Sequence, residues 1–141
     1  MGRIIGIDLG LKRTGLAVTD PTQLIATPLG VVGTGQLIDY LLDYLKREDV
    51  EGFVIGDPVK PDGSPTHTSE AVRSMCQKLR KTFPDKEVIL VDERFTTSLA
   101  LDAMISGGTT KKYRRKKGNL DKISATIILQ TYLEQKSHQK K

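Results

Sequence analysis

The sequence has no tryptophan, and only 5% of its 141 residues are aromatic. Its single cysteine, Cys76, cannot form a disulfide within the chain, so we expect a reducing, cytoplasmic setting. The two histidines, His67 and His138, lack partners at the spacing of metal ligands, which argues against a structural zinc site. No apolar run approaches the roughly 20 residues that span a bilayer, and no secretory signal is recognisable at the N-terminus. These absences favour a globular protein without a membrane partner.

Residues 111–117 carry six positive charges and no negative one. The six cations of this stretch account for the basic balance, because the formal net charge would be −1 without them and is +5 with them. They are Lys111, Lys112, Arg114, Arg115, Lys116 and Lys117. A concentrated basic cluster indicates contact with a polyanion more strongly than a diffuse excess does. We therefore expect a loop that binds a nucleic-acid backbone; the alternative is a solvated loop with no partner.

Hydrophobic periodicity predicts strands at residues 3–9, 14–20, 25–32, 52–56 and 87–91. Pro28 assigns the third strand to an edge of the sheet. The first three strands are close enough in sequence for an antiparallel meander, and the later ones alternate with helices and should be parallel. The result is an α/β fold in which helices flank a mixed five-stranded sheet. One domain should cover residues 1–135, with a frayed basic tail at 136–141.

Each of the longer predicted helices has one apolar face that should pack on the sheet. We expect one helix from the Thr34 cap to about Asp49, one from Thr68 or Ser69 to Phe83, a short one through about Ile105, and a last one capped by Asn119. The apolar faces comprise Leu37, Ile38, Leu41, Leu42 and Leu45 in the first, Val72, Met75, Cys76, Leu79 and Phe83 in the second, and Ile123, Ile127, Ile128 and Thr131 in the last. Cys76 is therefore predicted to be a core residue, and His67 to belong to a loop.

The stretch from Ile4 to Val18 contains an apolar strand, the acid Asp8, a turn with Gly10, and a second apolar strand. An acid at the end of a buried strand is costly unless a cation meets it. Asp8 is therefore a candidate ligand of a divalent metal, although it could also be a turn-forming residue.

Two further acids, Glu93 and Asp121, fall where they could join Asp8. Glu93 follows the last strand and Asp121 lies in the first turn of the last helix, and sites in open sheets gather at the carboxyl ends of parallel strands. Three carboxylates together repel one another unless cations intervene, and oxygen ligands suit Mg²⁺ or Mn²⁺. Two such ions about 4 Å apart can cleave a phosphodiester. Taken singly, Asp121 could interact with the helix dipole and Glu93 could pair with Arg94.

Four segments, in chain order, resemble the motifs of the YqgF (RuvX) family. They are Asp8-Leu9-Gly10 with Arg13 and Gly15; Gly56 and Pro58 with the turn Asp62-Gly63-Ser64; Asp92-Glu93-Arg94-Phe95-Thr96-Thr97; and Asp121-Lys122 followed by Ile127-Ile128-Leu129-Gln130-Thr131-Tyr132-Leu133. The resemblance implies a ribonuclease H-like fold with strand order 3-2-1-4-5. It also implies a metal-dependent nuclease whose catalytic, metal-binding carboxylates are Asp8, Glu93 and Asp121.

The chain departs from the family pattern at Asp57, where the family usually has an apolar residue. Asp57 adds a fourth carboxylate at the end of a neighbouring strand, and it could join the metal site or merely bind Lys60. A second departure is Ser124, which replaces the first of two alanines in the last motif and keeps the position small.

Family members are assigned to processing of the 5′ end of pre-16S ribosomal RNA and are also described as Holliday junction resolvase-like. The leading hypothesis is a Mg²⁺- or Mn²⁺-dependent endonuclease on structured RNA, a monomer or weak homodimer, in which Arg13, Arg94 and the 111–117 cations bind substrate. The alternatives are a resolvase of four-way DNA junctions and a non-catalytic module that binds nucleic acid or the transcription machinery. An actin-like ATPase, which Asp8-Leu9-Gly10 also resembles, is disfavoured because those enzymes enclose nucleotide between two such domains.

Overall fold

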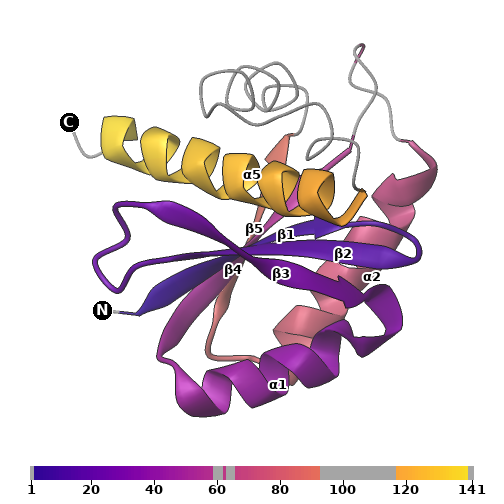
Figure 1. The fold of residues 1–141 in the computed structure, drawn as a ribbon, viewed down its shortest axis with the longest axis horizontal. Helices are drawn as coiled ribbons and strands as arrows, with labels where there is room; N and C mark the ends of the chain where they lie inside the picture. Colours follow the sequence, from indigo (N-terminus) through magenta and orange to yellow (C-terminus); the bar gives the residue numbers. More distant parts are fainter. Residues whose placement is uncertain (1, 59–61, 63–65, 93–116, 140–141) are drawn as a thin grey trace.

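The protein is described by a computed structural model that covers residues 2–58, 62, 66–92 and 117–139 (Figure 1). Within these residues the element order is β1 (Arg3–Leu9), β2 (Arg13–Thr19), β3 (Ala26–Gly33), the 3-10 helix η1 (Thr34–Gln36), α1 (Leu37–Arg47), β4 (Val50–Asp57), α2 (His67–Thr82), β5 (Glu87–Asp92) and α5 (Lys117–Gln139). The short helix expected through about Ile105 lies outside the described residues.

The five strands form one mixed sheet in the order β3-β2-β1-β4-β5. β1 pairs antiparallel with β2, and β2 with β3, whereas β1–β4 and β4–β5 are parallel. The predicted α/β fold class, strand order and directions are therefore confirmed, and β3, which contains Pro28, lies at an edge as expected.

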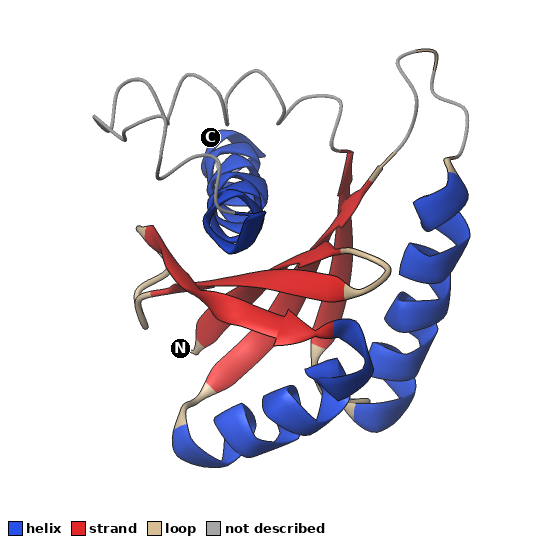
Figure 2. Ribbon diagram, turned by 45° about the vertical axis from the view of Figure 1, so that its right-hand side comes forward, coloured by secondary structure: helices blue, strands red, loops and turns tan. Residues whose placement is uncertain are grey.

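The two faces of the sheet are covered by different helices (Figure 2). One core packs α1 and α2 against the side chains of one face, including Ile5, Ile7 and Phe53. A smaller core packs α5 against the other face. The residues of this second core are Ile4, Ala17, Val54, Val91, Ala125, Ile128 and Leu129. None of the helices in the described part of the chain is both long and apolar enough to cross a membrane.

The first helix differs in detail from its prediction. Thr34 begins η1, and α1 starts only at Leu37 and ends at Arg47. Tyr44 is buried, whereas Leu42 is 41% exposed. The buried stripe follows the spacing of Leu37, Leu41 and Tyr44, and Leu42 lies beside it. Tyr44 was missed because the apolar ring of a tyrosine carries a polar hydroxyl, which lowers its rank in a search for core residues.

The last helix begins two residues before its predicted cap. Asn119 is the third residue of α5 and therefore lies in its first turn. The backbone N–H groups of a first turn have no helical partners, so a polar residue is tolerated there. The helix also continues to Gln139, into the segment expected to be a frayed tail. The expected inner face was partly wrong, because Ala125, Leu129 and Leu133 are buried with Ile128 and Thr131, whereas Ile123 and Ile127 are only partly buried.

The loop between β2 and β3 is organised by Asp20. The Asp20 carboxylate accepts hydrogen bonds from the backbone N–H groups of Thr22, Leu24 and Ile25, at 3.1, 2.9 and 2.8 Å, and from the Thr22 hydroxyl. The Thr22 hydroxyl first, and the Ile25 N–H next, hold the pKa of Asp20 well below its ordinary value of 3.8.

Asp20 is expected to contribute to the acid sensitivity of folding. A carboxyl whose pKa is lowered in the folded state stabilises the protein above the unfolded-state value near 3.8, and this contribution is lost as the pH falls. Melting temperatures between pH 5 and pH 2.5 should therefore fall less steeply for Asp20→Asn than for the wild type. Asp43→Asn, in an exposed ion pair with Arg47, is the matched control and should keep the wild-type slope. Equal slopes for all three proteins would contradict the role of Asp20.

Candidate active site

Asp8 is the last residue but one of β1 and is partly buried. Side chains alternate along a strand, and Ile5, Ile7 and Leu9 belong to the core beneath α1 and α2. Ile4 belongs to the core beneath α5. The Asp8 carboxylate therefore faces the α5 side of the sheet, at the carboxyl end of a strand whose neighbour β4 is parallel to it.

The strands on both sides of Asp8 carry glycine at its level. Asp8 pairs with Gly15 of β2. On β4, Gly56 follows Ile55, which pairs with Ile7. Because glycine has no side chain, neither of these two positions places a side chain over the Asp8 carboxylate.

Gly6 sets the distance between β1 and α5. A Cβ atom added at Gly6 would lie 2.8 Å from Leu129 Cβ and 2.9 Å from the Ala125 carbonyl oxygen, closer than real Cβ contacts allow. Ile4, which precedes Gly6 in β1, lines the same small pocket as Tyr132, which follows Leu129 in α5. The helix therefore runs in the opposite direction to β1. Two residues along β1 from Gly6 lead to Asp8, and one helical turn back from Ala125 leads to position 121, so these positions lie at the same level.

The other predicted ligands are less completely described. The backbone of Asp121 belongs to α5, but the position of its side chain is not described. Glu93 lies outside the described residues and directly follows Asp92, the last residue of β5. The cations Arg94, Lys111, Lys112, Arg114, Arg115 and Lys116 also lie outside, and Lys117 is the first residue of α5. Arg13 begins β2 and is exposed.

The turn between β1 and β2 is fixed by hydrogen bonds. The Gly10 N–H donates to the Arg13 carbonyl at 3.0 Å, and a Cβ at Gly10 would lie only 2.3 Å from that oxygen. From η1, the Thr34 hydroxyl donates to the Gly10 carbonyl at 2.6 Å, and the Thr34 N–H donates to the Lys12 carbonyl at 3.0 Å. The buried Thr14 hydroxyl lies 2.9 Å from that of Thr34. Thr34, expected only as a helix cap, therefore holds the turn that follows Asp8.

Asp57 faces the opposite side of the sheet from Asp8. It ends β4 in phase with Phe53 and Ile55, which belong to the core beneath α1 and α2. The pKa of the Cys76 thiol on α2 is raised mainly by burial; nearby Arg80 lowers it, and the charge of Asp57 raises it further. This geometry does not favour Asp57 as a ligand beside Asp8, and Lys60, its other predicted partner, lies outside the described residues.

The segment after β4 is tied to the start of α2. Thr66 caps the helix, and its backbone N–H donates a hydrogen bond to the Ser69 hydroxyl oxygen at 2.8 Å. The hydroxyls of Thr66 and Ser69 both donate to the Pro58 carbonyl. α2 begins at His67, one residue earlier than expected, so His67 belongs to a helix rather than to a loop. Cys76 is buried, as predicted.

The described residues suit a hard divalent cation in chemistry but do not complete a metal site. Asp8, Asp57 and Asp92 lie at or next to the carboxyl ends of three adjacent parallel strands, and all supply oxygen donors. One carboxylate oxygen of Asp57, Oδ1, is buried without a hydrogen bond. Within residues 2–58, 62, 66–92 and 117–139, however, no three acidic, histidine or cysteine side chains are close enough to hold one ion. Glu93 and Asp121 stay the predicted partners of Asp8 in a metal centre.

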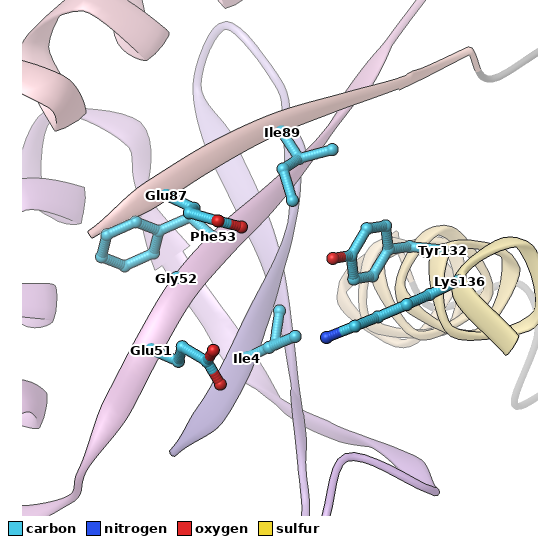
Figure 3. Close-up of a pocket in the computed structure, with 8 residues that line it drawn as sticks. All are labelled: Ile4, Glu51, Gly52, Phe53, Glu87, Ile89, Tyr132 and Lys136. Atoms are coloured by element: carbon cyan, nitrogen blue, oxygen red, sulfur yellow. The ribbon is translucent and has the colours of Figure 1, made fainter. Parts of the chain in front are cut away.

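A small pocket lies at the other end of the sheet and is unsuited to a nucleotide (Figure 3). Its volume is about 10 Å³, room for roughly one water molecule. Burial first, and then the charges of Glu87 and Glu51, raise the pKa of Tyr132, which lines it. The ammonium group of Lys136, another lining residue, donates to the Gln23 side chain at 3.0 Å. These contacts fasten α5 to the β2–β3 loop, and no sequence pattern indicated them.

Comparison with known proteins assigns the chain to a family. A sequence profile named RuvX, described as Holliday junction resolvase, matches residues 2–135. The chain belongs to the RuvX family. This confirms the family, also called YqgF, that the sequence motifs resemble.

RuvX relatives from several bacteria match almost the whole chain. The Amoebophilus asiaticus protein is 47% identical over 133 residues, covering 94% of each chain. The Parabacteroides distasonis protein is 47% identical over 139 residues, covering 99% of each. Both bear the name "Putative pre-16S rRNA nuclease". The names of the family and of these relatives agree with the nuclease predicted from the sequence.

Solved structures confirm the ribonuclease H-like fold of this RuvX chain. RuvC of Thermus thermophilus, solved in complex with a Holliday junction substrate, superimposes with a TM-score of 0.59. The superposition covers 98% of this chain and 97% of RuvC at 14% identity. A second T. thermophilus RuvC structure gives a TM-score of 0.52 at 15% identity. At such low identity the likeness concerns the fold alone.

Proposed function

We propose that this protein is a divalent-metal-dependent endonuclease that processes structured RNA, with the 5′ end of pre-16S rRNA as its substrate. The observation that supports this most is the position of Asp8, at the carboxyl end of β1, facing α5 and level with position 121. Relatives that share nearly half of its residues are named for this substrate.

In this proposal Asp8, Glu93 and Asp121 hold Mg²⁺ or Mn²⁺. Glu93 directly follows Asp92, which ends β5 at the same edge of the sheet at which β1 and β4 end, and this supports Glu93 as a candidate partner of Asp8. Asp121 is supported by the register of α5 on β1. Two such ions, when bound, supply the positive charge that activates water and stabilises the leaving oxygen in phosphodiester cleavage.

The chain's own residues would then position the RNA. Arg13 is exposed at the start of β2, beside the turn that follows Asp8, and it contacts a phosphate in this proposal. Arg94 and the cations of residues 111–117 would bind the backbone on either side. The protein would act as a monomer or weak homodimer.

The test is cleavage of an RNA that contains the 16S 5′ end with its leader. Cleavage is expected with Mg²⁺ or Mn²⁺ and not with EDTA, and it should weaken steeply as salt rises because each neutralised phosphate releases counterions. Cleavage that persists in EDTA would contradict the metal site. Tight binding without cleavage in either metal would instead favour a non-catalytic binding module.

The second candidate is resolution of four-way DNA junctions, which the description of the RuvX family favours. A symmetric junction is cut by a dimer with two matched sites. Paired, symmetric nicks by a dimeric protein would support this activity. A monomer that cuts the RNA precursor and leaves the junction intact would contradict it.

A further inference from the structure

Leu11 is an exposed apolar residue on the turn that follows Asp8. Its side chain is 69% exposed at the tip of the β1–β2 turn. Single exposed leucines are common and need no special account. Leu11 differs in its setting, because Lys12 and Arg13 follow it, both exposed, and Asp8 precedes it by three residues.

Hydrogen bonds on both sides of Leu11 hold the turn in the conformation that exposes its side chain to solvent. Gly10 and Lys12, on either side of it, accept hydrogen bonds at their carbonyls from Thr34, at 2.6 and 3.0 Å. The Gly10 N–H is bonded to the Arg13 carbonyl at 3.0 Å, which closes the turn. Five large apolar side chains are exposed in the described residues, and Leu11 is the one on the turn beside Asp8.

The position of Leu11 restricts what it can touch. Three peptide units span at most about 11 Å between the Cα atoms of Asp8 and Leu11. On one strand of duplex DNA, successive phosphates lie about 3.4 Å apart along the helix axis. At a comparable spacing in RNA, the leucine lies within roughly three nucleotides of a phosphate held at Asp8. Exposed cations that can hold a backbone, next to an exposed apolar side chain, match the way wedge residues enter a base step.

We propose that Leu11 is a specificity-determining wedge, which inserts beside a base next to the scissile phosphate and opens the stack of a structured RNA. Lys12 and Arg13 hold the neighbouring phosphates while it does so. The wedge selects a site where pairing ends, because opening a base step costs least there. This inference rests on the proposed function, in that it takes RNA as the substrate bound at Asp8.

The test uses a stem-loop RNA with 2-aminopurine placed in turn at each of the three nucleotides beside the cleavage site. Wild-type protein is expected to raise the fluorescence at one position on binding, because an unstacked 2-aminopurine is brighter. Leu11→Ser should abolish this rise and lower kcat/KM roughly tenfold, the order expected for one lost base contact. Leu11→Phe should retain the rise, since an aromatic ring also serves as a wedge.

Leu24→Ser is the matched control. Leu24 is 70% exposed, but it lies in the β2–β3 loop at the opposite end of the sheet from Asp8. Its variant should behave as the wild type. If Leu11→Ser also matches the wild type in fluorescence and kcat/KM, the wedge is overturned.

Binding separates this inference from the proposed function. The fluorescence rise is followed with Mg²⁺ present at the start of the reaction, before the RNA is cleaved, and cleavage is then measured in the same sample. A Leu11-dependent rise in a protein that cleaves no RNA would support the wedge and contradict the nuclease. RNA cleavage without any Leu11-dependent rise would support the nuclease and contradict the wedge.

Discussion

Asp8→Asn is expected to slow metal-dependent RNA cleavage by a factor on the order of 100 to 1,000, the loss typical of removing one group that stabilises transition-state charge. Asparagine keeps the shape of the side chain but removes the negative charge that would hold the metal. The measurement is single-turnover cleavage of the precursor RNA at saturating protein, so that weaker substrate binding does not obscure the chemical step.

Folding provides the control for Asp8→Asn. If Glu93 and Asp121 lie beside Asp8 as proposed, neutralising Asp8 in the absence of metal relieves repulsion between carboxylates, so the melting temperature should be unchanged or a few degrees higher. Asp39→Asn, on the exposed side of α1, should cleave at the wild-type rate. A fully active Asp8→Asn protein would end the proposed role of Asp8, whereas an inactive and unfolded one would assign it a structural role instead.

Gly6→Ala is expected to impair both stability and cleavage, although it adds a single methyl group. That methyl would lie 2.8 Å from Leu129 Cβ and 2.9 Å from the Ala125 carbonyl, so α5 has to move away from β1. Overpacking of this kind costs about 1–3 kcal/mol of unfolding free energy. Because α5 carries Asp121, a displacement of about 1 Å can also reduce cleavage roughly 100-fold.

Gly30→Ala tests whether the Gly6 effect is steric. Gly30 lies in β3, and a Cβ there meets nothing within 4 Å. Alanine in a strand is otherwise slightly favourable over glycine, so this variant should be neutral or more stable by about 0.5–1 kcal/mol. Chemical denaturation and cleavage assays on the two variants separate the outcomes. Similar stabilities for both would contradict the close packing of α5 on Gly6.

The sheet could be predicted because its signals are local. The topology is restricted by three such signals: short apolar strands such as Phe53–Ile55, Pro28 in the edge strand, and helices between the later strands. The ends of helices were less predictable. Asn119 has the chemistry of a cap, yet the helix begins at Lys117, because a preference for one position does not prevent the helix from extending past it.

The candidate site was only partly predictable, for a different reason. The sequence identified Asp8 from its place at a strand end, and the structure describes it there. No sequence pattern indicated that Gly6 sets the register of α5, since that role depends on close packing against Leu129, more than a hundred residues away. It also could not separate Asp57 from Asp8, because the face of each side chain depends on the pairing of β1 with β4. The roles of Glu93 and Asp121 remain predictions.

The covering of one sheet face by α5 has a consequence for biosynthesis. The ribosome makes all five strands before α5, so Ile4, Ala17, Val54 and Val91 have no cover until that helix emerges. Position 121 becomes available to Asp8 only at the same late moment. A nascent chain with the proposed chemistry is therefore expected to stay inactive until α5 has been translated and has packed on the sheet, bringing position 121 to Asp8.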